Sequence, residues 1–434
     1  MTLAEVRLWG RTIGAVSLAE GNEVAAFEYD SAFAASGIQV APLMMPLSRR
    51  VYSFPELSRP SFYGLPGLLA DSLPDKFGNE LINSWLATQG RAPDSFNAVE
   101  RLRYTGARGM GALEFTPQLG PRMPNSREIQ IDQLVELASE VLTARRNLQV
   151  SFADATREQA ITDILRVGTS AGGARAKAVI AWNPLTNEVR SGQVEAGKGF
   201  ECWLLKFDGV KGNRDKELDD PRGYGAIEYA YANMARDCGI DISECRLFEE
   251  NGRRHFMTRR FDRLTDGEKL HMQSLGAMAH YDFNQAGAYA YEQALLVIRQ
   301  LELPMHAIEQ QFRRMAFNII ARNQDDHVKN IAFLMDKQGI WSLAPAFDMT
   351  YSYNPSGDWT ARHQMTLNGK RDDFLMADFE AAAKGASMQR GRAKAIVHEV
   401  QGVVAGWQDY ARDAGVPSEW AAKIHAVLRV ATFA

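Results

Sequence analysis

The stretch Asn323-Gln-Asp-Asp-His-Val-Lys-Asn330, with Ala344-Pro-Ala-Phe-Asp348 a short way beyond it, decides the fold that this sequence predicts. Asp325 and Asn330 stand five residues apart, and Asp348 supplies a second acid. Kinase-type phosphotransferases use this arrangement. Their first Asp orients the hydroxyl nucleophile and accepts its proton, while the Asn and the distal Asp hold the magnesium ions that bridge the ATP phosphates. We therefore predict Asp325 as the catalytic base and Asn330 and Asp348 as the magnesium ligands.

A predicted hairpin connects the two halves of this motif. Residues 331–335 and 340–343 are apolar runs typical of short strands, and residues 336–339 between them have the composition of a turn. Two strands joined in this way would bring Asp348 back beside Asn330. The hairpin is the reason why we predict one metal site here.

Upstream residues supply the nucleotide-binding parts that such a site needs. The loop 167–177 contains glycines, which let backbone amides approach phosphate oxygens closely. Lys206 is embedded in the strand pattern 201–207, and a buried lysine needs an anionic partner. Glu228, in a helical run, is placed like the helix glutamate that pairs with the strand lysine in protein kinases.

Each of these elements is a weak signal when taken alone. A glycine pair is most often a plain turn, a strand lysine usually extends to water, and adjacent aspartates usually lie in a solvated loop. The order along the chain is a stronger signal: glycine loop, strand lysine, helix glutamate, linker, acid–amide loop, hairpin and acid. This order predicts a phosphotransferase.

The sequence also resembles the HipA family of bacterial toxin kinases, the toxic half of type II toxin–antitoxin pairs. The similar segments are residues 67–75, 109–114, 169–177, 205–207, 260–263, 325–330 and 343–348. The resemblance implies an α+β, protein-kinase-like fold of two lobes. A β-rich small lobe and a HipA-type N-terminal subdomain would precede an all-helical large lobe.

The resemblance further implies roles for individual residues. Lys206 would bind the ATP phosphates, the backbone around Arg259 and Phe261 would meet the adenine, and Asp262 would lie toward the ribose. Ser170 aligns with a serine that some members autophosphorylate; the added charge of about −1.5 to −2 would repel ATP, although a small residue is equally expected there for fit. The residues that we predict to bind ATP are Ser170, Gly172, Gly173, Ala174, Lys177, Lys206, Glu228, Arg259, Phe261, Asp262, His327, Lys329 and Asn330.

The remaining side chains of the acid–amide loop have less certain roles. We predict that His327 braces the loop by hydrogen bonding and that Asp326 either braces the loop or faces solvent. Lys329 either neutralises the transferred phosphate or is only a loop charge. The three cysteines lack the spacing of a zinc site.

We predict three parts of the chain: an N-terminal subdomain at 1–116, the kinase small lobe with the glycine loop at 127–263, and the helical large lobe at 264–434. The first part should open with a three-strand meander over residues 6–29, and the Pro-rich stretch 117–124 is the predicted linker. Further helices are expected at 132–145, 224–235, 306–322, 390–411 and 418–430, with Arg313 and Arg314 on a solvated face and Ser418 as an N-cap.

Composition agrees with a compact cytosolic enzyme. The chain has 434 residues, of which 46% are hydrophobic and 24% charged, and these values argue against disorder. The net charge of −4 gives no reason to expect independent nucleic-acid binding, and three cysteines fit a reducing compartment. There is no signal-peptide pattern and no apolar run of the roughly 18 residues that a membrane helix needs. We expect a cytoplasmic protein without a membrane partner.

Three functions from different classes fit the sequence. The leading one is an ATP- and Mg²⁺-dependent Ser/Thr protein kinase; the resemblance implies a translation-related target such as glutamyl-tRNA synthetase, growth arrest, and a small helix-turn-helix antitoxin of the HipB type through which DNA is contacted only indirectly. The second is a phosphotransferase of the same fold that acts on a small molecule. The third is a non-catalytic corepressor bound to its antitoxin, against which the intact Lys206, Asp325, Asn330 and Asp348 argue.

Overall fold

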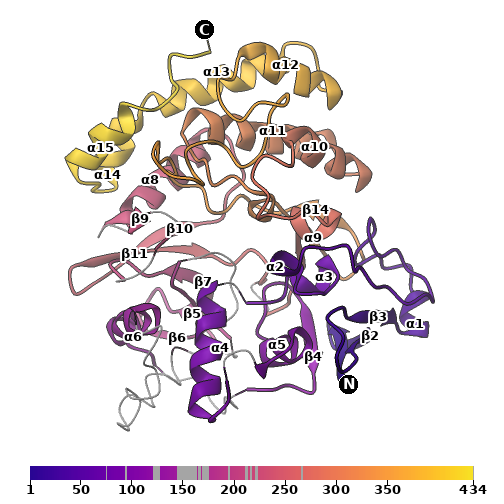
Figure 1. Cartoon of the computed structure of the whole chain (residues 1–434). Coiled ribbons are helices and arrows are strands. Elements are labelled where there is room, and N and C mark those ends of the chain that lie inside the picture. The colour runs from indigo at the N-terminus through magenta and orange to yellow at the C-terminus, as the bar shows by residue number, and fades with distance from the viewer. Residues whose placement is uncertain are drawn as a thin grey trace.

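The computed structural model describes residues 1–74, 76–92, 95–120, 128–143, 164, 168, 175–193, 196–210, 214–215, 218–219, 223–264 and 267–433. In Figure 1 the N-terminal half of the chain forms the lower part of the molecule and the C-terminal helices form the upper part. Most of the predicted phosphate-binding loop at 167–177, including Ser170, Gly172, Gly173 and Ala174, lies outside the described residues, which take in only 168 and 175–177 of this loop.

The N-terminal subdomain is built on a four-stranded antiparallel sheet in the order β3-β2-β1-β4. Its strands are β1 (Thr2–Leu8), β2 (Arg11–Leu18), β3 (Ala26–Tyr29) and β4 (Leu113–Thr116). Alternate residues of β1 are buried, as expected for a sheet with one face on a core. The predicted meander is therefore confirmed. Four helices contribute buried side chains to the same core: α1 (Ser31–Ala34), α2 (Arg59–Phe62), α3 (Gly67–Ala70) and α5 (Ala98–Thr105). The longer helix α4 (Lys76–Thr88) contributes Phe77 and Leu81 to the core of the small lobe instead.

The small lobe contains a five-stranded sheet in the order β10-β11-β7-β5-β6. The strands are β5 (Lys177–Trp182), β6 (Val189–Ser191), β7 (Glu201–Lys206), β10 (Cys245–Glu250) and β11 (Arg253–Arg259). The turn between β10 and β11 is Asn251-Gly252, and both residues have positive φ, which the type I′ hairpin turn requires. Helices α6 (Ile131–Thr143) and α8 (Tyr224–Asp237) and the short strands β8 (Arg214–Asp215) and β9 (Leu218–Asp219) complete the described part of this lobe.

The large lobe is mainly helical. Its helices are α9 (Leu275–Ala279), α10 (Tyr291–Gln300), α11 (Met305–Ile320), the 3₁₀ turn Val328–Asn330, α12 (Met376–Gly385), α13 (Arg392–Val404), α14 (Trp407–Asp413) and α15 (Ser418–His425). The expectation of an all-helical lobe needs one correction, because β12 (His271–Ser274), β13 (Ala332–Met335) and β14 (Trp341–Leu343) form a small sheet. Strands β13 and β14 are the predicted hairpin, and β12 adds a third strand that the sequence did not indicate.

Two further expectations for this lobe are wrong. The helix expected at 390–411 is divided into α13 and α14, with Ala405 and Gly406 between them. Ser418 is the first residue of α15, and Pro417 takes the N-cap position. Pro417 fits there because proline is well accommodated at a helix start, where its missing N–H costs no helical hydrogen bond.

Arg313 and Arg314 are buried, contrary to the solvated face expected for them. Arg313 donates to the carbonyl of Cys238 at 2.8 Å and pairs with Glu399 at 2.6 Å, while Arg314 donates to the carbonyl of Ala344 at 2.8 Å. Both sides of α11 are covered, so a polar stripe on this helix meets backbone carbonyls of other elements instead of water.

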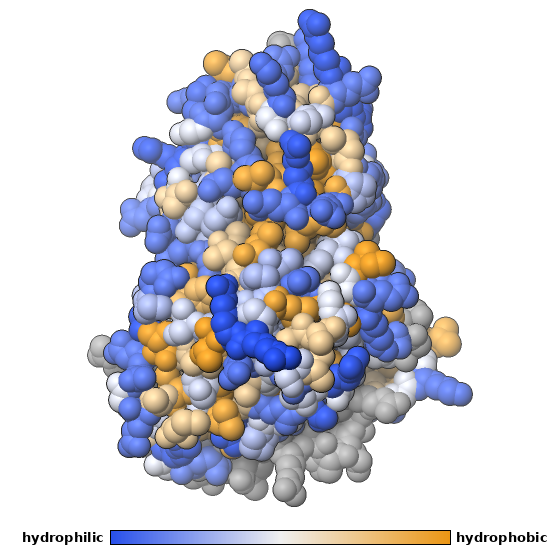
Figure 2. All heavy atoms as spheres, turned by 90° about the vertical axis from the view of Figure 1, so that its right-hand side faces the viewer, coloured by the Kyte–Doolittle hydropathy of each residue, from blue (hydrophilic) through white to orange (hydrophobic). Residues whose placement is uncertain are grey.

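Helix α8 joins the two lobes. It packs on β10 and β11 of the small lobe and on α13 and α14 of the large lobe, and Figure 1 shows it between the two. Its Tyr231 has no exposed surface, stacks edge-on against Trp407, and donates a hydrogen bond to the carbonyl of Ala321 at 2.7 Å. One face of the whole molecule, drawn in Figure 2, is mostly polar, with apolar side chains in small groups. Among the described helices, none has the length and apolar content of a membrane span.

Candidate active site

Lys206, at the end of β7, is the centre of the candidate site. Its Nζ lies 2.5 Å from Oε1 of Glu228 on α8 and 2.6 Å from Oδ1 of Asp348, which follows β14. The side chains of Lys206 and Glu228 are only 11% and 2% exposed. The structure thus brings together three residues that the sequence predicted as parts of one site.

The charges of this group stabilise one another. Burial lowers the pKa of Lys206, but Asp348 and Glu228 outweigh burial and raise it above its ordinary value. Burial likewise raises the pKa of Asp348, yet the charges of Lys206 and Lys177 lower it to about 2. Lys177 lies opposite Lys206 in the ladder between β5 and β7. Asp348 therefore remains a carboxylate at neutral pH, as a metal ligand must.

The backbone of Asp348 has a left-handed conformation with φ of 53°. Such a conformation is strained for most residues and is tolerated best by Asp and Asn. The Asn323 side-chain amide donates to the carbonyl of Asp348 at 3.4 Å and to Oδ1 of Asn318 at 2.9 Å. These contacts connect Asp348 to Asn323, the first residue of the acid–amide loop at 323–330.

The acid–amide loop, residues 323–330, is held by its own amide. Asn330 Nδ2 donates to the backbone carbonyl of Asp325 at 2.8 Å, so its amide oxygen points away from that bond. The carboxylate of Asp325 is 22% exposed, and its Oδ1 accepts a hydrogen bond from Nε1 of Trp359 at 2.6 Å. Strands β13 and β14 are antiparallel, which returns the chain from Asn330 toward Asp348.

Asp326 is an internal brace of the loop. It is 3% exposed, and its carboxylate accepts hydrogen bonds from Tyr291 at 2.5 Å, from the backbone N–H of Gln364 at 2.7 Å and from Nδ1 of His363 at 2.7 Å. Of the two interpretations offered from the sequence, the structure supports bracing. Burial raises the pKa of Asp326, but His363 and these donors lower it below its ordinary value.

His327 and Lys329 line the same loop. His327 Nδ1 accepts from the backbone N–H of Lys329 at 3.3 Å, and its Nε2 lies 3.9 Å from Oδ1 of Asp325. The first contact agrees with the predicted bracing role. Lys329 Nζ lies over the ring of Phe283 at 4.6 Å. A phosphate-neutralising role for Lys329 remains a prediction.

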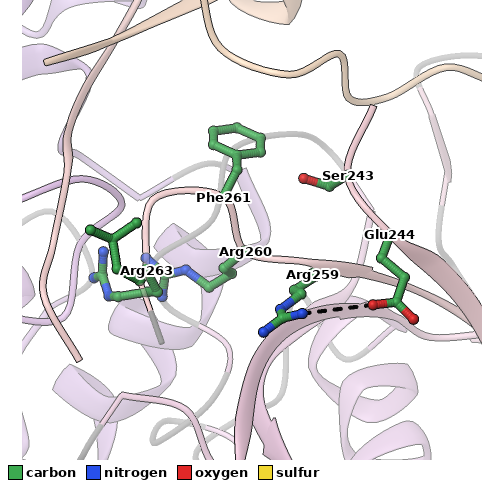
Figure 3. Close-up of a pocket in the computed structure, with 7 residues that line it drawn as sticks. Ser243, Glu244, Arg259, Arg260, Phe261 and Arg263 are labelled. Carbon is green, nitrogen blue, oxygen red and sulfur yellow. Dashed lines mark ion pairs between the residues drawn. The ribbon is translucent and has the colours of Figure 1, made fainter. Parts of the chain in front are cut away.

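The predicted adenine region contains a pocket of about 450 Å³. Figure 3 shows its lining, in which Arg259 pairs with Glu244 at 3.8 Å while Phe261 projects from the linker after β11. The rings of Phe261 and Phe347 are 5.8 Å apart, so the linker contacts the residue that precedes Asp348. The pocket is therefore next to the segment that leads to Asp348, the acid predicted as a magnesium ligand.

The carboxylate of Asp262 has no exposed surface, contrary to the ribose contact expected from the sequence. It accepts hydrogen bonds from Arg260 at 2.6 and 2.9 Å, from Arg263 at 2.8 Å and from the backbone N–H of Gly111 at 2.7 Å. Burial raises the pKa of Asp262, but the two arginines and this N–H lower it far below its ordinary value. In this structure Asp262 joins the linker to the N-terminal subdomain.

Three contributors to the loop were missed by the sequence analysis: Trp359, His363 and Tyr291. They lie 34, 37 and 35 residues from the acids that they contact. No spacing rule connects such distant residues.

The donor set fits a magnesium ion. Mg²⁺ prefers oxygen ligands, typically one or two carboxylates with waters and substrate phosphates completing the coordination. Asp348 offers an ionised carboxylate and Asn330 an amide oxygen that is turned away from its own hydrogen bond. Among the described residues, no group of three or more His, Cys, Asp or Glu side chains could hold a metal ion.

Two family models match the chain. The HipA N-terminal domain matches residues 4–116, and the HipA-like C-terminal domain matches residues 169–407, which is more than half of the 434 residues. A solved structure of Shewanella oneidensis MR-1 HipA, in a toxin–antitoxin complex with HipB and operator DNA, superposes with a TM-score of 0.69 at 16% identity. The match covers 98% of this chain and 96% of that chain, and it shows a common two-lobed, protein-kinase-like fold.

Curated relatives match over shorter regions. The Sinorhizobium fredii protein named "Putative kinase Y4mE" is 24% identical over 194 residues, which are 42% of this chain and 39% of that protein. A Haemophilus influenzae protein with the same kinase designation is 28% identical over 134 residues, or 28% of this chain and 39% of that protein. The chain thus spans about two fifths of each relative. Both domain models and the fold agree, and the chain belongs to the HipA family.

Proposed function

We propose that this chain is an ATP-dependent Ser/Thr protein kinase that acts as the toxin of a toxin–antitoxin pair. The observation that carries the proposal is the buried ammonium of Lys206, which bridges the helix glutamate Glu228 and the metal-type acid Asp348. Burying a charged lysine between two acids costs desolvation free energy. Binding of an anionic phosphate by this lysine would offset part of that cost. The kinase names of the two curated relatives support the same activity.

The chain's own residues account for the chemistry. Asp325 would orient the substrate hydroxyl and accept its proton, and Lys206, held in place by Glu228, would contact the ATP phosphates. Asn330 and Asp348 would hold Mg²⁺, which neutralises charge on the phosphates when it is bound. The pocket around Arg259 and Phe261 would receive the adenine.

The proposed partners come from the relative of known structure. Because the Shewanella oneidensis HipA was solved with HipB and operator DNA, we propose a small DNA-binding antitoxin of the HipB type as the partner of this chain. Contact with DNA would then be indirect, through the antitoxin. We propose a protein of the translation machinery, such as glutamyl-tRNA synthetase, as the substrate, with growth arrest as the result.

Transfer of labelled γ-phosphate to protein tests the proposed activity. Purified protein with Mg²⁺ and γ-labelled ATP, alone or with a bacterial extract, should label itself or an extract protein. No labelled protein beyond that seen in extract alone would overturn the kinase proposal.

Replacing Asp348 by asparagine should weaken Mg²⁺-dependent nucleotide binding by about tenfold or more, since the variant loses a charged metal ligand. Isothermal titration of a non-hydrolysable ATP analogue, with and without Mg²⁺, measures this difference. Asp358→Asn is the matched control, because Asp358 is an exposed acid of a nearby loop. Equal Mg²⁺ dependence in Asp348→Asn and wild type would contradict the metal assignment.

Incubation with Mg-ATP should add one phosphate to the intact mass of the wild-type chain, and Ser170→Ala should abolish this addition. The added charge in a phosphate-binding loop repels ATP, so the modified protein should also lose kinase activity. Thr169→Ala, one residue away, is the control and should retain the modification. The same mass increase in Ser170→Ala as in wild type would remove Ser170 as the site.

A further inference from the structure

The segment that follows Asp348 lies along the catalytic loop. The backbone N–H of Gln324 donates to the carbonyl of Ser352 at 3.1 Å, and the N–H of Ser352 donates to the carbonyl of Arg322 at 3.1 Å. Asn323 and Ser352 form a parallel bridge. The start of this segment is therefore paired, through its backbone, with the residues just before Asp325.

Further along, the segment contacts Asp325 through a side chain. The indole Nε1–H of Trp359 donates to Oδ1 of Asp325 at 2.6 Å, and this length is typical of a hydrogen bond to a charged oxygen. Trp359 is only partly exposed. The side-chain amide of Gln364 donates to the backbone carbonyls of Trp359 and Arg362, and to that of Gln324 at 3.3 Å. Gln364 thus connects the backbone of Trp359 to that of Gln324, and this connection holds the indole in place.

The far end of the segment is fixed on Asp326. His363 and the N–H of Gln364 both donate to the Asp326 carboxylate at 2.7 Å. Arg429, near the C-terminal end of the described chain, donates to Nε2 of His363 at 3.3 Å and to Asp372. Since the segment is attached on both sides of Trp359, the indole has little freedom to leave Asp325.

We propose that Trp359 is a positioning residue that sets the orientation of the Asp325 carboxylate for proton transfer. This inference rests on the proposed kinase function. The Asp325 carboxylate is 22% exposed, and the short hydrogen bond from the Trp359 N–H to its Oδ1 restricts rotation of the group about its terminal bond. A general base must lie within hydrogen-bond distance of the substrate hydroxyl in a defined geometry, so this constraint acts on the chemical step.

Replacing Trp359 by phenylalanine keeps an aromatic ring and removes the N–H donor. We expect kcat for phosphoryl transfer to fall about tenfold, the effect of losing one hydrogen bond to a charged group, with KM for ATP unchanged. Trp9→Phe is the matched control, because Trp9 Nε1 donates at 2.7 Å to the carbonyl of Lys269, which is not part of the proposed site. The control should keep the wild-type kcat. An unchanged kcat in Trp359→Phe would overturn the proposal, and an increased kcat would identify Trp359 as an inhibitory lid instead.

A spectroscopic measurement tests the contact without requiring activity. In protein labelled with ¹⁵N in its tryptophans, the Trp359 indole signal is identified by its absence from Trp359→Phe. In Asp325→Ala this signal should move upfield because the charged acceptor is lost, whereas the Trp9 signal should stay in place. An unmoved Trp359 signal would overturn the inference. If the wild type transfers no phosphate, the proposed function fails, and the indole signal still decides whether the contact exists.

Discussion

Asp325→Asn is expected to reduce phosphoryl transfer about a thousandfold while Mg-ATP binding remains near that of the wild type. The substitution removes the proton acceptor and keeps the shape of the side chain, and a positioned general base contributes about 10²–10⁴-fold to such reactions. Asparagine can still accept the hydrogen bond from Trp359, so the loop geometry should persist. Single-turnover transfer of labelled phosphate measures the rate, and calorimetry measures binding.

Asp358→Asn serves as the matched control for this experiment. Asp358 is an exposed aspartate in the segment that also carries Trp359, so the same chemical change is made beside the site without touching it. This control should retain the wild-type rate. If Asp325→Asn lost ATP binding as well as transfer, Asp325 would be a metal or nucleotide ligand and not the base.

Asp262→Ala is expected to destabilise the protein by about 3–5 kcal/mol, the effect of leaving a buried charge without its partner. The carboxylate of Asp262 has no exposed surface and neutralises two guanidinium groups, those of Arg260 and Arg263. Its loss also removes the acceptor of the Gly111 N–H in the N-terminal subdomain. Urea unfolding followed by circular dichroism measures the change.

The control for Asp262→Ala is Asp409→Ala. Asp409 also pairs with an arginine, Arg412, but both side chains are about 70% exposed, and exposed ion pairs contribute little. Asp409→Ala should leave the unfolding midpoint unchanged. Equal effects of the two substitutions would contradict the role of Asp262 as the link between the linker and the N-terminal subdomain.

The difference in the free energy of unfolding between wild type and Asp262→Ala should become smaller as the pH falls into the acid range. The folded protein holds the pKa of Asp262 below its ordinary value of 3.8, so the acid contributes stability when it is ionised in both states. This contribution is fully present above that ordinary value and is lost as the pH falls toward the pKa of the folded state. The difference should therefore be constant near neutral pH and decrease only in strong acid.

Local sequence patterns predicted much of the fold. The strands β13 and β14, the meander of the N-terminal subdomain and the helix that carries Glu228 follow from apolar periodicity and from turn residues within a few positions of one another. The lysine–glutamate pair was also predicted, because its order along the chain is the order of the elements that carry it. These features depend on short-range chemistry or on chain order, and both can be read from a sequence.

Other features depend on contacts that local pattern does not encode. Periodicity suggested a solvated face for Arg313 and Arg314, but the elements that cover α11 come from distant parts of the chain. The resemblance placed Asp262 toward a ribose, whereas its carboxylate accepts from Gly111, 151 residues away. A polar side chain has the same pattern in the sequence whether it meets water or a buried partner.

Chain order was enough to predict which acids, amide and lysine belong to the candidate site and in what order their elements follow. The donor that reaches each acid became known from the folded structure: Trp359 for Asp325, His363 for Asp326, and two arginines for Asp262. The physical reason is that a hydrogen bond depends on distances of about 3 Å between atoms. Such distances between remote residues are fixed by the packing of whole elements, and packing is a property of the folded chain.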